Sequence, residues 1–170
     1  MNLFKQTSPT EADPFFNRIG KDWMLLSSTD GTHPNTMTVS WGCIGKLWNK
    51  PVAICFIRPQ RHSYGLVESS THLTLAHLPE GYRDALALCG KASGRDCNKF
   101  EAAGLTCSFT ENGIPYPAES DEVLVCRKLY ADDLREGAFI DPSILPTHYP
   151  ASDLHRFYVC EIEQVLVRDR

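Results

Sequence analysis

The feature that most constrains the fold is a succession of short strand patterns with little helix between them. Such stretches are apolar throughout or alternate apolar with polar side chains, and turn residues bound them. They occupy residues 22–29, 36–44, 50–59, 71–78, 105–110, 121–134 and 155–169. Regular alternation of strands with helices is missing, which disfavours a doubly wound parallel sheet. The pattern therefore predicts a mainly β fold, an antiparallel β-barrel with short helices.

Helical spacing of apolar residues is confined to three short segments, at residues 61–70, 80–92 and 95–104. The segment 135–153 is rich in loop residues and contains three prolines, so we expect an excursion over a partner subunit or over a site. The unbroken apolar run within residues 50–59 predicts a strand that is buried on both faces or forms part of a barrel wall.

Length and charge limit the possible organisation and partners. At 170 residues the chain is long enough for one well-covered core and too short for two. We interpret residues 1–20 as an N-terminal arm and residues 21–170 as a single domain. The first residues contain no apolar run typical of a signal peptide or a transmembrane helix, so we expect a cytoplasmic protein. A formal net charge of −4 argues against nucleic-acid or anionic-membrane partners.

The seven cysteines indicate neither a disulfide framework nor a zinc site, because their number is odd and no C-x-x-C pair occurs. Cys43, Cys55, Cys126 and Cys160 lie in apolar strand patterns, and we expect them to be buried as small hydrophobic side chains. Fingerprints of nucleotide-binding loops, zinc hydrolases and serine hydrolases are also missing. The sequence therefore predicts no metal site and no hydrolase chemistry.

The stretch "NTMTVSW", residues 35–41, combines a strand pattern with an uncharged polar face made of Thr36, Thr38 and Ser40. Extended backbone with small hydroxyl side chains offers amides, carbonyls and hydroxyls to the edge of a planar heterocycle. Met37 and Trp41 would add apolar surface beside it. The alternative is a strand whose polar face meets water, and residue types alone leave both open.

The stretch "RPQRHSYG" begins where the buried strand of residues 50–59 ends. Arg58, Arg61 and Ser63 cluster at the start of a predicted helix. Two guanidinium groups, a hydroxyl and the free amides of a helix start form a cradle suited to a phosphate group, even in a chain of negative net charge. The alternative is a solvated basic turn at the end of a strand.

Three motifs together resemble one family: N-x-M-T-x-S-W at residues 35–41, R-P-x-R-x-S/T at residues 58–63 and S-G-R-D-x-x-K-F at residues 93–100. They resemble the flavin reductase-like, FMN-binding split-barrel proteins, in particular the flavoredoxin-like branch. The similarity runs from about residue 22 onward. It implies an antiparallel split barrel and a homodimer with FMN near the interface.

The resemblance also implies which residues bind FMN. The strand that carries Asn35, Thr36, Met37 and Thr38 would lie along the flavin ring, with Trp41 nearby or in the dimer core. The phosphate would be held by Arg58, Arg61 and Ser63. The remaining positions are Tyr64 beside the ribityl chain, Cys89 and Ser93 in a second wall of the pocket, and Lys99 at the phosphate or the pyrimidine edge. Asn98 replaces an Asp that is common in the family, which leaves a solvated Lys99 as the alternative.

The function implied by the resemblance is an NAD(P)H-dependent flavin reductase that passes electrons through FMN to a small-molecule or protein acceptor. His155, at the start of the last strand pattern, is our candidate for a catalytic role in proton handling or in supporting the site. The alternatives are a non-enzymatic, flavoredoxin-like electron carrier and a structural dimer that has lost flavin. A redox role for Cys43 is not expected, because no partner cysteine accompanies it.

Overall fold

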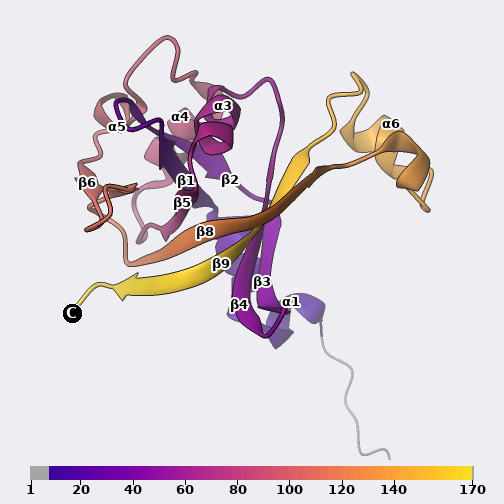
Figure 1. Ribbon diagram of the computed structural model, residues 1–170, viewed down its shortest axis with the longest axis horizontal. Helices are drawn as coiled ribbons and strands as arrows, with labels where there is room; N and C mark the ends of the chain where they lie inside the picture. Colours follow the sequence, from indigo (N-terminus) through magenta and orange to yellow (C-terminus); the bar gives the residue numbers. More distant parts are fainter. Residues whose placement is uncertain (1–7, 170) are drawn as a thin grey trace, which may run out of the picture.

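The computed structural model describes residues 8–169, which form one large antiparallel sheet and a small two-stranded sheet (Figure 1). The large sheet has the strand order β2-β1-β5-β8-β9-β4-β3. Its strands are β1 (Met24–Thr29), β2 (Pro34–Val39), β3 (Gly42–Leu47), β4 (Lys50–Ile57), β5 (His72–His77), β8 (Glu122–Asp133) and β9 (Arg156–Val167). The small sheet pairs β6 (Cys107–Phe109) with β7 (Pro115–Pro117).

The large sheet curls around a single apolar core. Met37 and Val39 of the edge strand β2 share one buried cluster with Ala53, Cys55 and Ile57 of β4, although four strands separate β2 from β4 in the sheet order. Contact between such distant strands requires a strongly curled sheet, which is the geometry of a barrel. The prediction of a mainly β, antiparallel barrel is therefore confirmed.

Short helices and helical turns precede and connect the strands. They are α1 (Pro9–Ala12), α2 (Pro14–Asn17), the π-helical turn η1 (Arg18–Asp22), α3 (His62–Ser69), α4 (Arg83–Lys91), α5 (Lys99–Ala102), the 3₁₀ turn η2 (Glu136–Ala138) and α6 (Ile144–His148). A second apolar cluster, which includes Leu25, Leu86, Cys89 and Phe100, joins α4 and α5 to the sheet. This cluster fixes α4 over β1 and β2 and so positions the loop that follows α4.

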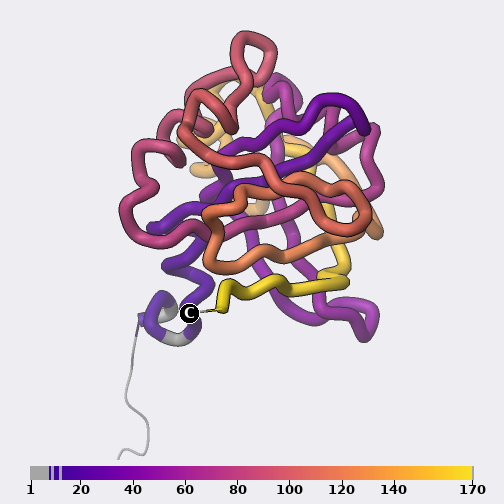
Figure 2. The backbone as a smooth tube through the Cα atoms, turned by 90° about the vertical axis from the view of Figure 1, so that its left-hand side faces the viewer, coloured from indigo at the N-terminus to yellow at the C-terminus, as the bar shows by residue number. Residues whose placement is uncertain are grey.

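β8 and β9 pair over most of their length and carry the chain from the barrel to a projecting arm. Two register shifts in their ladder, at Val125/Cys126 and Lys128/Tyr130, bend the ribbon. The arm holds η2 and α6 and projects away from the barrel (Figure 1). On the opposite side, the β6–β7 ribbon packs over β5 and β1 (Figure 2). The predicted excursion of residues 135–153 therefore exists, with short helices that its prolines had not indicated.

Two predicted elements are wrong in detail. The strand predicted at residues 36–44 is two strands, β2 and β3, because the chain leaves the first ladder at Ser40 and joins β4 from Gly42 onward. The helix predicted at residues 95–104 is reduced to α5, since residues 92–98 form the loop before it. The predicted hairpin of β1 and β2 is confirmed, with Leu26 opposite Met37.

The structure corrects one of the four cysteine predictions. Cys55, Cys126 and Cys160 are buried in the barrel core, as the strand pattern predicted. Cys43 is exposed, because β3 is an edge strand whose side chains from Cys43 to Leu47 face solvent in this chain. Its apolar neighbours in sequence had suggested burial, but Ile44 and Leu47 are also exposed, at 43% and 38%.

The segment before β1 packs against the barrel. Ile19 is buried in the barrel core, and Phe15 contacts the same cluster. The first seven residues of the predicted N-terminal arm lie outside the described residues. No helix within residues 8–169 combines the length and apolarity needed to cross a membrane.

Candidate functional site

Of the three hydroxyls on the polar face, Thr36 and Thr38 are paired within the protein, whereas Ser40 is exposed. Thr38 donates a hydrogen bond to the carbonyl oxygen of Leu86 in α4. Thr36 is fully buried; it accepts from the hydroxyl of Ser27 and donates to the carbonyl oxygen of Leu26 at 3.3 Å. The lack of charge at Thr36 and Thr38 thus follows from their contacts with β1 and α4, respectively. Both hydroxyls are already paired within the chain.

A hollow of about 210 Å³, the ring pocket, lies where β2 ends. It is lined by Met37, Thr38, Val39, Ser40, Trp41, Phe56, Arg58, Arg61 and His155. Two of these are aromatic and three carry basic groups, so the pocket suits a planar molecule with polar edges. Trp41 is 42% exposed, and its ring centroid lies 5.1 Å from that of His155. Of the predicted residues, the structure brings Met37, Thr38, Trp41, Arg58, Arg61 and His155 together here.

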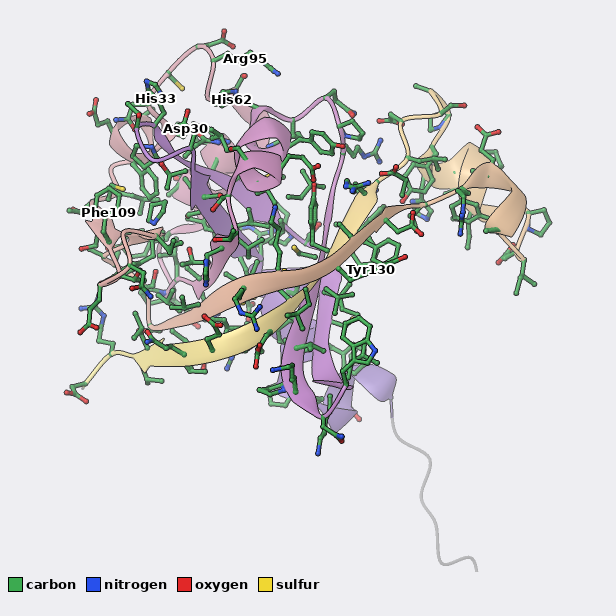
Figure 3. The ribbon with its side chains drawn as sticks, viewed as in Figure 1. Asp30, His33, His62, Arg95, Phe109 and Tyr130 are labelled. Carbon is green, nitrogen blue, oxygen red and sulfur yellow. The ribbon has the colours of Figure 1, made fainter. Side chains whose placement is uncertain are left out.

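A second hollow of about 240 Å³, the basic pocket, adjoins the first at Arg61. Its lining is Gln60, Arg61, His62, Lys91, Ala92, Ser93, Gly94, Arg95 and Lys99. Five of these side chains are basic and none is acidic. Figure 3 shows two of them, His62 and Arg95, at the end of the barrel beyond α3. Arg61 lines both pockets, so one elongated molecule with an anionic end can occupy the pair.

Arg61 and Lys99 converge on the carbonyl end of α4. The Arg61 guanidinium donates to the backbone oxygens of Gly90 at 2.6 Å and Cys89 at 3.3 Å. Nζ of Lys99 donates to the same Cys89 oxygen at 3.0 Å. The free carbonyls at a helix C-terminus carry partial negative charge, which attracts both cations. The ion pairs formed within residues 8–169 include neither side chain.

The electrostatics of this pair reflect burial without a counter-charge. Lys99 is 2% exposed. Its burial, and secondarily the charge of Arg61, lowers the pKa of Lys99 to about 8. Burial also lowers the pKa of Arg61. The alternative of a solvated Lys99 is therefore wrong, because the helix α5 turns this side chain inward.

Gly94 allows the loop between α4 and α5 to lie against β2 and α3. A Cβ at this position would be 2.4 Å from Oδ1 of Asn35 and 2.5 Å from Cδ2 of His62, so only glycine fits. Nδ2 of Asn35 in turn donates to Oγ of Ser63 at 2.8 Å. Ser63 is thus paired with Asn35 beside this loop, and it does not line the basic pocket.

Arg58 lies apart from the basic pocket. Its guanidinium forms an ion pair with Asp153 and donates to the backbone oxygen of His148 at 2.9 Å. Gln60 also donates to Asp153, at 2.7 Å. Arg58 thus anchors the base of the arm against β4 and borders the ring pocket. Arg58 and Arg61 therefore both border the ring pocket, but only Arg61 also lines the basic pocket.

His155 occupies the inner end of the ring pocket. Its Nδ1 lies 2.8 Å from the hydroxyl of Tyr149, and both residues are buried. Burial, and then the nearby charge of Arg58, lowers the pKa of His155 to about 4. The imidazole is therefore neutral at physiological pH.

The other predicted residues serve the framework. Tyr64 packs against the barrel core, and Cys89 contributes its backbone oxygen while its side chain is fully buried. Ser93 lines the basic pocket as expected. Sequence reasoning missed Tyr149 and Asp153, both within the excursion. A tyrosine and an acid close before His155 were the available signal, but no spacing rule connects them to the pocket.

A larger hollow of about 540 Å³ lies at the other end of α4, lined in part by Asp22, His77, Arg83 and Asp121. It contains none of the predicted residues. Arg83 is occupied there, since its guanidinium stacks 3.4 Å from the ring centroid of Trp23 and donates to the Lys21 oxygen. The convergence of unpaired cations favours the two pockets at Arg61 as the functional site.

The fold and the site together define a class of protein: antiparallel barrels that carry an aromatic pocket next to a basic pocket. Residues 16–170 match the model of the flavin reductase like domain, so the chain belongs to that family. The family prediction is confirmed. A search of curated proteins found no match.

Three solved structures show the same fold at low sequence identity. A protein of Shewanella frigidimarina NCIMB 400 with a split barrel domain is 20% identical, at a TM-score of 0.70 over 100% of this chain and 81% of that one. An FMN-binding protein from Thermus thermophilus is 18% identical, with a TM-score of 0.69 over 99% of this chain and 83% of that one. Flavoredoxin of Desulfovibrio vulgaris (Miyazaki F) is 19% identical, with a TM-score of 0.68 over 86% of this chain and 69% of that one.

Proposed function

We propose that this protein binds FMN and acts as an NAD(P)H-dependent oxidoreductase of the flavin reductase type, passing electrons through the flavin to an acceptor. The observation that carries the proposal is the cation pair of Arg61 and Lys99 at the end of α4. Burying a charge without a counter-ion costs free energy, and a bound phosphate would offset that cost. The family and the FMN-binding relatives support the choice of a flavin.

The residues present fit the shape and charge of FMN. Arg61, Ser93 and Lys99 would hold the phosphate in the basic pocket. Met37, Trp41 and Phe56 would border the ring in the ring pocket. Gly94 leaves the loop backbone close to the basic pocket, where a larger residue would displace it. Arg61 joins the two parts because it lines both pockets.

Bound FMN would supply the redox chemistry, accepting a hydride from a reduced nicotinamide and releasing electrons to the acceptor. The chain's own part is to bind and orient. The neutral His155 offers a hydrogen-bonding group at the inner end of the ring pocket, and Arg58 holds the arm beside it. No side chain has to take up a proton during hydride transfer.

We also propose that a second copy of the chain covers the outer face of β3, β4, β9 and β8. A row of rings, the aromatic strip, runs along this face through Trp48, Tyr130, Phe157 and Phe56 to His155. Successive ring centroids lie 6.5, 6.1, 6.2 and 6.3 Å apart. Trp48 and Tyr130 are about half exposed, and Figure 3 shows Tyr130 where β8 leaves the barrel. An exposed apolar strip continuous with the ring pocket is typical of an interface.

The test is spectroscopic. Purified protein is loaded with FMN, made anaerobic and mixed with NADH or NADPH, and the visible flavin band is followed. Bleaching at the rate of ordinary turnover supports a reductase. Binding of FMN without bleaching by either nucleotide would favour the alternative, a non-enzymatic electron carrier. Protein that takes up no FMN would contradict both.

A further inference from the structure

The Tyr149–His155 pair is the buried polar contact at the ring pocket that the proposed function leaves without a role. The tyrosine hydroxyl lies 2.8 Å from Nδ1 of the imidazole, and the rings meet nearly edge to face, 5.5 Å apart. Tyr149 is 6% exposed and His155 8%. The two residues flank one short connection, because Tyr149 directly follows α6 and His155 directly precedes β9.

The direction of this hydrogen bond follows from the chemistry of the two groups. A phenol is a stronger donor than an imidazole N–H, and an imidazole lone pair is a stronger acceptor than a phenol oxygen. Burial raises the pKa of Tyr149, so its hydroxyl keeps its proton. Within residues 8–169 the hydroxyl has no hydrogen-bond partner besides Nδ1. The phenol therefore donates, Nδ1 accepts, and the ring proton lies on Nε2.

Nε2 of His155 is accessible, and His155 lines the ring pocket. Within residues 8–169, the one side-chain nitrogen or oxygen that is fully buried and lacks a hydrogen-bond partner is Asp153 Oδ1. Nε2 of His155 is therefore not sealed inside the protein. The ring is held on the other sides by Trp41 at 5.1 Å and Phe56 at 6.3 Å between centroids. The Nε2–H donor is thus open to whatever occupies the pocket.

Tyr149 is itself fixed by Arg58. The guanidinium carbon lies 5.2 Å from the centre of the Tyr149 ring, and the same group binds the His148 oxygen and Asp153. A cation above the face of an aromatic ring is attracted by the ring's π electrons, so Arg58 helps to fix the Tyr149 ring. The charged groups that face His155 are therefore Arg58, from the end of β4, and Asp153, from the base of the arm.

We infer that Tyr149 is a positioning residue that fixes His155 as the Nε2–H tautomer, so that His155 donates a hydrogen bond to a carbonyl oxygen of the bound ligand. The ligand's identity rests on the proposed function; the tautomer does not. His155 then recognises the ligand as a donor and does not act as a general base. A carbonyl oxygen is present both on a flavin ring and on a nicotinamide carboxamide, and the experiment separates these two sources.

The experiment is ¹⁵N NMR of histidine-labelled, flavin-free protein at pH 7, with His155 assigned through H155Q. The expected wild-type spectrum shows a protonated Nε2 and an unprotonated Nδ1. Tyr149→Phe keeps the ring for Arg58 and removes the hydroxyl; both tautomers should then be populated, and the pKa of His155 should rise. Tyr116→Phe, at a tyrosine of β7 remote from both pockets, is the matched control and should match wild type.

Either of two results would overturn the inference: a protonated Nδ1 in the wild type, or a Tyr149→Phe spectrum identical to wild type. If the flavin supplies the carbonyl oxygen, addition of FMN should shift the Nε2 signal. If the nicotinamide supplies it, the signal should shift only when NAD⁺ is added to the FMN-loaded protein. No shift with either ligand would contradict the donor role. These signals need no turnover. Failure of the reductase assay with the expected spectra would therefore remove the proposed function and leave the tautomer assignment standing.

Discussion

Lys99 and Arg61 donate hydrogen bonds to the same backbone oxygen, that of Cys89, at 3.0 and 3.3 Å. One carbonyl at the end of α4 cannot balance two full positive charges, because a helix C-terminus carries only about half an elementary charge. The protein therefore holds a preformed, positively charged site beside the ring pocket. This relationship leads to the first two predictions.

Replacing Lys99 with Met should weaken FMN binding while leaving riboflavin binding unchanged. A charge-assisted contact contributes about 1.5–3 kcal/mol, so the dissociation constant of FMN should rise about 10- to 100-fold. Quenching of flavin fluorescence measures both ligands in the same assay. Equal losses for FMN and riboflavin would show that Lys99 supports the fold of the pocket and does not contact phosphate.

The affinity for FMN should fall as the pH rises above about 8. Lys99 in the free protein has a pKa of about 8, and a bound phosphate would raise it, so binding takes up a proton above that pH. Titrations of FMN between pH 7 and 9.5 measure this slope. The Lys99→Met variant is the control, because it lacks the titrating group. A wild-type slope as flat as that of the variant would contradict the assignment.

Gly94→Ala should destabilise the protein and weaken FMN binding. The added methyl group would meet Asn35 at 2.4 Å, and overpacking of this kind costs about 1–3 kcal/mol. Gly65→Ala is the matched control, since a Cβ at position 65 meets nothing within 4 Å and lies in the helix α3. That variant should be as stable as wild type or about 0.5–1 kcal/mol more stable. Urea unfolding of the two variants measures the difference.

The aromatic strip should be the site of self-association. Tyr130→Glu should convert the dimer to a monomer, because it places a charge in the interface. Phe109→Glu is the control at an aromatic of similar exposure, 52% against 46%, on the remote β6 (Figure 3). Sedimentation velocity measures the oligomeric state. A wild type that is monomeric at micromolar concentration, or a dimer that survives Tyr130→Glu, would contradict the proposed interface.

His155 should make the protein less stable as the pH falls from about 6.5 to 4. Its pKa is about 4 in the folded protein and about 6.5 when unfolded, so in this range only the unfolded chain binds the proton. Between pH 7 and 4.5 this effect lowers the free energy of unfolding by about 2 kcal/mol. His155→Gln should lose correspondingly less stability over the same range, and identical losses in urea titrations would contradict a buried neutral His155.

Much of the strand arrangement could be predicted because a side-chain period of two is a local property of the sequence. The alternation in β5 and β9 shows this period directly, and the unbroken apolar run of β4 indicates a strand that is buried on both faces. The break between β2 and β3 could not be seen, because it depends on which strand each segment pairs with. Cys43 was placed inside for the same reason, since an edge strand has the residue types of a central one.

The sequence by itself determined the family and the residue types of the site, because the motifs around Asn35, Arg61 and Lys99 are continuous in the chain. Only the tertiary structure decided which of these residues meet. It turned Thr38 toward α4, paired Arg58 with Asp153 and brought Arg61 and Lys99 to the same backbone oxygen. The physical reason is the distance along the chain over which each property is decided. Spacing within a segment dictates which face of a strand or helix a side chain occupies, whereas the residue that it contacts depends on packing between segments distant in the chain.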